Sequence, residues 1–142
     1  MPKDPKKILI IDDDPVLIRM LEKVLKMDGY DVISALSGKA GLERAKKEEP
    51  FTILLDVLMP DINGKELARQ LRSEPKTCDI PIVFLTITLD VAKDKGHETI
   101  EVDDIKYPAM AKPMHTRKLL SLLRKEVNKR LHKNDDPLKK LS

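Results

Sequence analysis

The stretch Ile8-Leu9-Ile10-Ile11-Asp12-Asp13-Asp14-Pro15 decides the fold, because an apolar run gives way at once to three carboxylates and a proline. Four branched aliphatic residues in a row are typical of a strand buried on both faces, as in a parallel sheet. Pro15 suits the first turn of a helix, and Asp14 suits the capping position before it. Apolar residues then continue at helical spacing as far as Gly29, which ends the helix.

The same order of strand and helix repeats along the chain. Further strands are predicted over residues 31–36, 51–55, 80–85 and 106–111, and further helices over 37–47, 64–72 and 115–133. The segment 87–105 is the least regular, and Asp90 is its candidate cap for a weak helix. Five strands that alternate with about five helices indicate a parallel sheet with helices on both faces. We expect one domain over residues 1–133 and a frayed polar tail over residues 134–142.

The composition favours a globular protein with an aliphatic core. Of 142 residues, 41% are hydrophobic, 36% are charged and only 3% are aromatic. Twenty-seven basic against 24 acidic residues give a net charge of +3, a balance too even to indicate nucleic-acid binding. The single cysteine, Cys78, predicts a reducing compartment, and no apolar run reaches the roughly 20 residues of a membrane span. We therefore expect a cytoplasmic protein that does not insert into membranes.

Five polar residues stand at or just beyond the C-terminal ends of predicted strands: Asp12, Asp13, Asp56, Thr86 and Lys112. In an open parallel sheet these ends lie side by side, so the five residues should converge on one crevice. Mg²⁺ prefers oxygen ligands, and clustered carboxylates resist joint ionisation unless a cation is present. A carboxylate can accept a phosphoryl group, to which a lysine and a threonine offer a charge and a hydroxyl donor. The pattern predicts a phosphoryl site that depends on a divalent cation, with Asp56 as the nucleophile.

Four motifs, in this order, resemble those of bacterial response-regulator receiver domains. They are residues 8–15, Leu-Leu-Asp-Val-Leu-Met-Pro-Asp at 54–61 with Gly64, Pro-Ile-Val-Phe-Leu-Thr at 81–86, and Lys-Pro at 112–113. The resemblance spans residues 6–131, nearly the whole chain. It implies a flavodoxin-like, doubly wound α/β fold, with a five-stranded parallel sheet in the order 2-1-3-4-5 and about five helices.

The resemblance also implies a role for each site residue. Asp56 resembles the phosphoacceptor, Asp12 and Asp13 the acids that bind Mg²⁺ together with Asp56, Thr86 the switch hydroxyl and Lys112 the pocket lysine. Such a domain takes a phosphoryl group from a sensor histidine kinase or a phosphotransfer protein, and a downstream protein then reads its altered surface. It is a regulatory phosphoacceptor rather than an enzyme, although it assists its own phosphotransfer and slow dephosphorylation. The resemblance implies a monomer or a dimer that depends on phosphorylation.

Four features depart from the pattern of that family. Ala109 stands where the family often has an aromatic residue, and Tyr107 lies two residues earlier on the same face of the strand. Ile87 follows the switch threonine, where the family usually has a small residue. Leu58, two residues after the phosphoacceptor, is apolar and unsuited to hold a hydrolytic water, which predicts a long-lived phosphoryl state. The segment 87–105 is longer and more polar than in the family and replaces most of its usual output face.

The sequence leaves other interpretations open. Ile87 and Ala109 are compatible with a receiver-like docking module that works without phosphorylation. Asp12-x-Asp14 after a strand also fits the nucleophile motif of haloacid-dehalogenase-type phosphatases, in which Asp14 would be the general acid, but no cap insertion or later acidic pair is evident. The basic residues of the predicted helix 115–133 suit an acidic partner or nucleic acid, although a solvated face opposite its leucines is the simpler interpretation.

Overall fold

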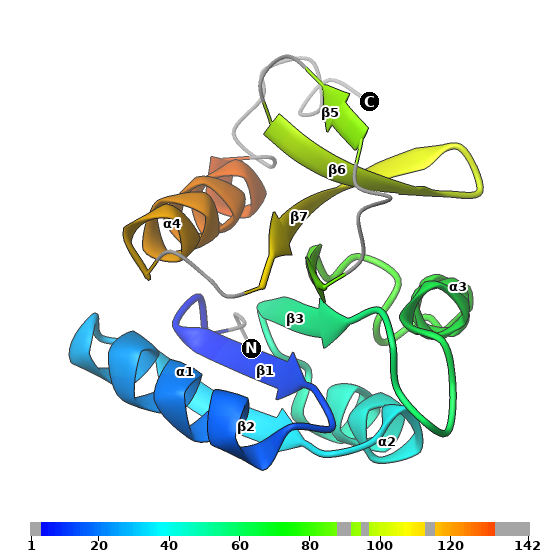
Figure 1. Ribbon diagram of the computed structural model, residues 1–142, viewed down its shortest axis with the longest axis horizontal. Coiled ribbons are helices and arrows are strands. Elements are labelled where there is room, and N and C mark those ends of the chain that lie inside the picture. Colours follow the sequence, from blue (N-terminus) through cyan, green and yellow to red (C-terminus); the bar gives the residue numbers. More distant parts are fainter. Residues whose placement is uncertain (1–3, 88–91, 95–96, 113–115, 133–142) are drawn as a thin grey trace.

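The computed structural model describes residues 4–87, 92–94, 97–112 and 116–132, which form one sheet with helices on both faces (Figure 1). The helices are α1 (Pro15–Met27), α2 (Gly38–Glu48), α3 (Gly64–Ser73) and α4 (Thr116–His132). The strands are β1 (Lys7–Ile11), β2 (Asp31–Ala35), β3 (Thr52–Asp56), β4 (Ile82–Thr86), β5 (Ala92–Asp94), β6 (His97–Val102) and β7 (Ile105–Ala111). The predicted tail, residues 134–142, lies outside the described residues.

The sheet contains seven strands in the order β2-β1-β3-β4-β7-β6-β5. The first five strands of this order are parallel, and β7 occupies the fifth place. The predicted flavodoxin-like order is therefore confirmed for this part of the sheet. Beyond β7 the sheet continues with β6 and β5, each antiparallel to its neighbour, so the expected number of five strands is too small.

The described residues hold four helices, one fewer than the expected number of about five. The difference falls between β4 and β7, where the chain forms β5 and β6 instead of a helix starting near Asp90, a residue that itself lies outside the described part. Half of the residues of β6 are β-branched, and such side chains favour extended backbone over helix. The hairpin then reverses at Asp103 and Asp104, with φ angles of 51° and 67°. A two-residue hairpin turn of the favoured type requires this left-handed conformation at both positions.

Two apolar layers hold the helices against the sheet. On one face, α1 and α4 pack against Ile8, Ile10 and Leu54 of the central strands. Most basic residues of α4 are exposed, whereas Arg130 turns inward, donates to the carbonyl of Phe51 and lies 4.2 Å from the centre of its ring. On the other face, α2 and α3 share their layer with four buried residues of the β6–β7 hairpin: Ile100, Val102, Tyr107 and Ala109. The hairpin therefore belongs to the core of the domain. No helix in the described part of the chain combines the length and apolarity that a membrane span needs.

The packing of the hairpin can be tested by comparing two of its isoleucines. Ile100 is 4% exposed, whereas Ile105 is 46% exposed. We expect Ile100→Ala to lower the free energy of unfolding by about 2–4 kcal/mol, because it leaves a cavity in the core, and Ile105→Ala to lower it by less than about 1 kcal/mol. Urea unfolding of both variants checks this expectation. Equal losses would show that the hairpin does not pack into the core.

Candidate functional site

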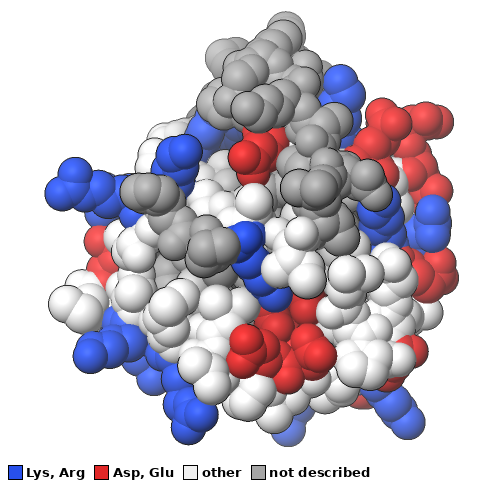
Figure 2. All heavy atoms as spheres, viewed as in Figure 1, with Lys and Arg blue, Asp and Glu red and all other residues white. Residues whose placement is uncertain are grey.

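The predicted site residues gather at one edge of the sheet. Asp12 and Asp13 follow β1, Asp56 ends β3, Thr86 ends β4 and Lys112 follows β7. These strands are adjacent and parallel, so their carboxyl ends meet at the same edge. Figure 2 shows a patch of acidic side chains with a basic side chain beside it near the middle of the visible face. The predicted convergence of the site is confirmed for the carboxylates and the lysine by the distances between their charged groups.

Three carboxylates form the acidic part of the site. Asp12, Asp13 and Asp56 each offer an oxygen atom within 4.8 Å of the other two. Asp12 and Asp56 are buried, whereas Asp13 is exposed to solvent. Hard divalent cations take oxygen ligands and tolerate a mixture of carboxylates and water. The donor set and the exposure of Asp13 therefore fit a metal ion of this kind.

Lys112 brings a positive charge to the two buried carboxylates. Its Nζ lies 2.7 Å from Asp12 Oδ2 and 3.4 Å from Asp56 Oδ1. Burial disfavours the ammonium, but the hydrogen bond to Asp12 and the charges of both carboxylates outweigh this effect, so the pKa of Lys112 is raised. The lysine is therefore held in its charged form beside Asp56.

The surroundings of Asp56 disfavour its ionised form, in spite of the lysine beside it. Burial is the main cause that raises the pKa of Asp56 to about 6, and the charge of Asp12 adds to it. Lys112 and the backbone N–H of Leu58, 3.3 Å from Asp56 Oδ1, act in the opposite direction but do not compensate fully. A divalent cation at the carboxylates would supply the missing positive charge.

The loop after Asp56 is fixed where its two ends meet and again at Asp61. The N–H of Gly64 donates to the carbonyl of Val57 at 2.7 Å, and a Cβ on Gly64 would lie only 2.2 Å from the carbonyl oxygen of Asp56. Asp61, within the loop, accepts hydrogen bonds from the N–H groups of Gly38 and Lys39 at the start of α2, at 3.1 and 2.9 Å. Sequence reasoning missed this anchor, because Asp61 and α2 are distant in the chain and no local signal pairs them.

The residues that depart from the family pattern lie in two different environments. Leu58 and Ile87, which follow closely after Asp56 and Thr86 in the chain, expose 48% and 69% of their surface. Thr86 itself is fully buried. Ala109 and Tyr107 are both buried and face the same apolar layer, as the spacing predicted. The Tyr107 ring packs edge-on against Phe84 with centroids 5.4 Å apart. It is thus a core residue.

Comparison with known proteins gives a consistent match. The family model of the response regulator receiver domain matches residues 8–124. A probable transcriptional regulator, ycf27 of Porphyridium aerugineum, is 38% identical over 133 residues, which cover 93% of this chain and 53% of that protein. A crystal structure of a putative response regulator from Chloroflexus aurantiacus has a TM-score of 0.75 and 33% identity, covering 88% of this chain and 99% of that one. The chain thus spans about half the length of its ycf27 relative.

The raised pKa of Asp56 predicts a stability effect in the metal-free protein. The pKa of Asp56 is about 6 in the folded protein, whereas an unfolded aspartate has a pKa of about 3.9, so the folded state binds the carboxyl proton more tightly. The free energy of unfolding therefore falls as the pH rises from about 4 to about 6 and Asp56 loses this proton. At pH 7 the loss is on the order of 3 kcal/mol. We expect Asp56→Asn, which cannot ionise, to be more stable than the wild type at pH 7 and similar to it at pH 4.

Urea unfolding in EDTA at both pH values measures this difference. Asp31→Asn, at an exposed carboxylate that starts β2, is the matched control and should change little at either pH. A stability difference between Asp56→Asn and the wild type that stays constant from pH 4 to pH 7 would contradict the expectation.

Proposed function

This chain belongs to the family of response regulator receiver domains of two-component signal transduction, and we propose that Asp56 is its phosphoacceptor. The observation that carries the proposal is the position of Asp56 between Asp12, which shares the carboxylate cluster, and Lys112, whose Nζ is 3.4 Å away. A buried carboxylate next to a fixed ammonium can accept an anionic group whose charge the ammonium then stabilises.

Each pocket residue has a distinct part in the proposed transfer. An oxygen of Asp56 attacks the phosphorus of the donor, the bond between phosphorus and the donor's leaving nitrogen or oxygen breaks, and an acyl phosphate forms. Lys112 offers its charge to the phosphoryl oxygens, and Thr86 offers a hydroxyl donor. Mg²⁺ held by Asp12, Asp13 and Asp56 would neutralise the carboxylates and the incoming phosphoryl charge. Phosphorylation adds about −1.5 to −2 charge at this edge of the sheet, which a downstream protein can detect.

Exposed apolar side chains that follow the site residues in the chain support a protein as the phosphodonor. Val16 and Met20 are exposed on the first turns of α1, and Leu58 and Ile87 are exposed next to the phosphoacceptor and the switch threonine in the chain. Such a group is typical of a protein contact surface. The proposed donor is a sensor histidine kinase or a phosphotransfer protein, which would meet this domain in the cytoplasm.

The sequence left two other functions open, and the site and the family match exclude only one of them. The phosphatase of the haloacid-dehalogenase type is wrong, because the family match is to receiver domains and the Asp14 carboxylate caps α1, accepting from Val16 and Leu17. The docking module that works without phosphorylation stays a prediction. The complete set of carboxylates and lysine in the pocket favours the phosphoacceptor instead.

Phosphorylation by a small donor tests the proposal. We expect the wild-type protein, incubated with Mg²⁺ and acetyl phosphate, to gain the mass of one phosphoryl group. The gain should be absent in Asp56→Asn and in EDTA, because the nucleophile or the cation is then missing. Intact-mass spectrometry provides the measurement, and Asp31→Asn, remote in the chain from every pocket residue, should be phosphorylated like the wild type. An adduct of equal amount in Asp56→Asn would place the phosphoryl group elsewhere.

The lifetime of the phosphoryl group provides a second test. Leu58 is half-exposed and carries no group that could orient a water molecule at Asp56. We therefore expect slow loss of the phosphoryl group in the wild type. Leu58→Gln supplies an amide and should speed the loss by about tenfold, and Leu58→Met, which supplies none, should not. Time courses of the phosphorylated mass after removal of acetyl phosphate measure both rates, and a wild-type lifetime of seconds would contradict the expectation.

A further inference from the structure

We propose that Glu98, on the hairpin strand β6, is a positioning residue for Lys112 in the phosphorylation pocket. The inference rests on the proposed function, because the position of Lys112 matters through its contact with Asp56. Glu98 lies 14 residues before Lys112 in the chain, in the segment where the sequence departs most from the family pattern.

Strand β7 is paired on different sides in its two halves. Residues 105–108 pair with β6, and residues 109–111 pair with β4. Within the described residues, the register with β6 ends at Pro108, which has no N–H to donate. The last part of β7 therefore leaves β6 just before it reaches the pocket.

Glu98 replaces the missing strand partner at this point. Its Oε2 accepts a hydrogen bond from the N–H of Ala111 at 3.3 Å. The next N–H, that of Lys112, points to the opposite edge and donates to the carbonyl of Thr86 at 2.8 Å. The end of β7 is thus held from both sides, by Glu98 on one and by β4 on the other, and Lys112 extends from this fixed backbone to Asp12 and Asp56.

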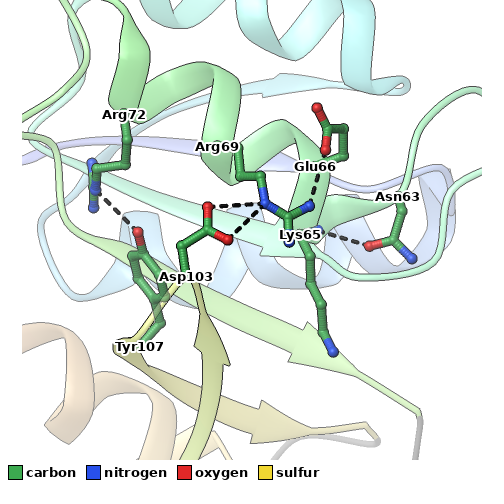
Figure 3. A network of polar contacts seen from close by, with 7 residues as sticks. All are labelled: Asn63, Lys65, Glu66, Arg69, Arg72, Asp103 and Tyr107. Carbon is green, nitrogen blue, oxygen red and sulfur yellow. Dashed lines mark hydrogen bonds and ion pairs between the residues drawn. The ribbon is translucent and has the colours of Figure 1, made fainter.

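The hairpin that carries Glu98 is itself firmly attached to α3 (Figure 3). Arg69 Nε donates to both carboxylate oxygens of Asp103 at 3.1 and 2.9 Å, and its guanidinium also pairs with Glu66 at 3.0 Å. One turn further along α3, Arg72 Nε donates to the Tyr107 hydroxyl at 3.2 Å. Figure 3 shows both arginines pointing from α3 toward the hairpin, where Asp103 and Tyr107 meet them.

Arg72 also connects the hairpin to the chain before β4. Its Nη1 donates to the carbonyl oxygens of Cys78 and Ile80 at 2.9 and 2.8 Å, and its guanidinium lies 5.3 Å from the centre of the Tyr107 ring. Together with the buried side chains of Ile100 and Val102, these contacts give β6 a fixed base. Glu98 can therefore hold Ala111 in place and does not simply follow its movements.

The rate of phosphorylation of the full chain by acetyl phosphate with saturating Mg²⁺ tests the proposal. We expect Glu98→Ala to slow the reaction about fivefold, the effect of one net hydrogen bond, and Glu98→Gln, which keeps an acceptor oxygen, to react at a rate close to the wild type. Glu101→Ala removes the same charge from an exposed position of β6 and is the matched control, expected to keep the wild-type rate.

A double-mutant cycle separates positioning from a general structural effect. If Glu98 acts through Lys112, Glu98→Ala should cause no further loss in a Lys112→Met background, whereas a structural effect would cause the same fivefold loss there and overturn the proposal. Faster reaction of both Glu98 variants would identify repulsion of the anionic donor and would also overturn it. A wild-type protein that takes up no phosphoryl group would overturn the proposed function and this inference together. A phosphorylated wild type with an unaffected Glu98→Ala would overturn the inference alone.

Discussion

The ion pairs of Lys112 with Asp12 and Asp56 are the interaction on which the pocket depends. Two buried carboxylates close to each other would be strongly unfavourable without a nearby positive charge. The carboxylates belong to β1 and β3, whereas the ammonium comes from the end of β7, on the far side of β4. Lys112 therefore has to reach past the end of β4, where Thr86 lies buried. One side chain thus links the ends of four strands at the place where the phosphoryl group is proposed to bind.

Lys112 does not neutralise the whole negative charge of the carboxylate cluster, and the charge that remains makes the site suitable for a cation. One ammonium faces three carboxylates, and the pKa of Asp56 stays near 6 in spite of it. A fully neutral cluster would have little affinity for a cation, whereas a cluster without Lys112 would be harder to bury. The packing of the surrounding sheet offsets the unfavourable free energy of burying these charged groups. Its central strands are buried on both faces and carry long aliphatic side chains, which fix the positions of the carboxylates.

The sequence was sufficient to predict the elements whose signals are local. The apolar runs of the central strands and the cap formed by Asp14 and Pro15 were found correctly, and so was the convergence of the carboxylates with Lys112, which follows from parallel strand order alone. The second strand of the hairpin, β7, was predicted, but β6 was missed because its core-facing residues, such as Ile100 and Val102, alternate with polar residues over only one short strand. Its attachment to α3 was out of reach for a different reason. Arg69 and Asp103 are exposed charged residues 34 positions apart, and nothing in either neighbourhood indicates the other.

The exchange of a helix for a hairpin changes how this side of the domain is connected to the pocket. A helix bonds its backbone internally, so it contacts a neighbouring strand mainly through side chains. Strand β6 instead shares backbone hydrogen bonds with β7, the strand that ends beside Lys112, and then adds the contact from Glu98 to Ala111. In the same hairpin, Tyr107 is held between Phe84 and Arg72 and lies in the core, away from the surface. The hairpin is therefore joined to the strand beside Lys112 through backbone hydrogen bonds as well as through side-chain packing.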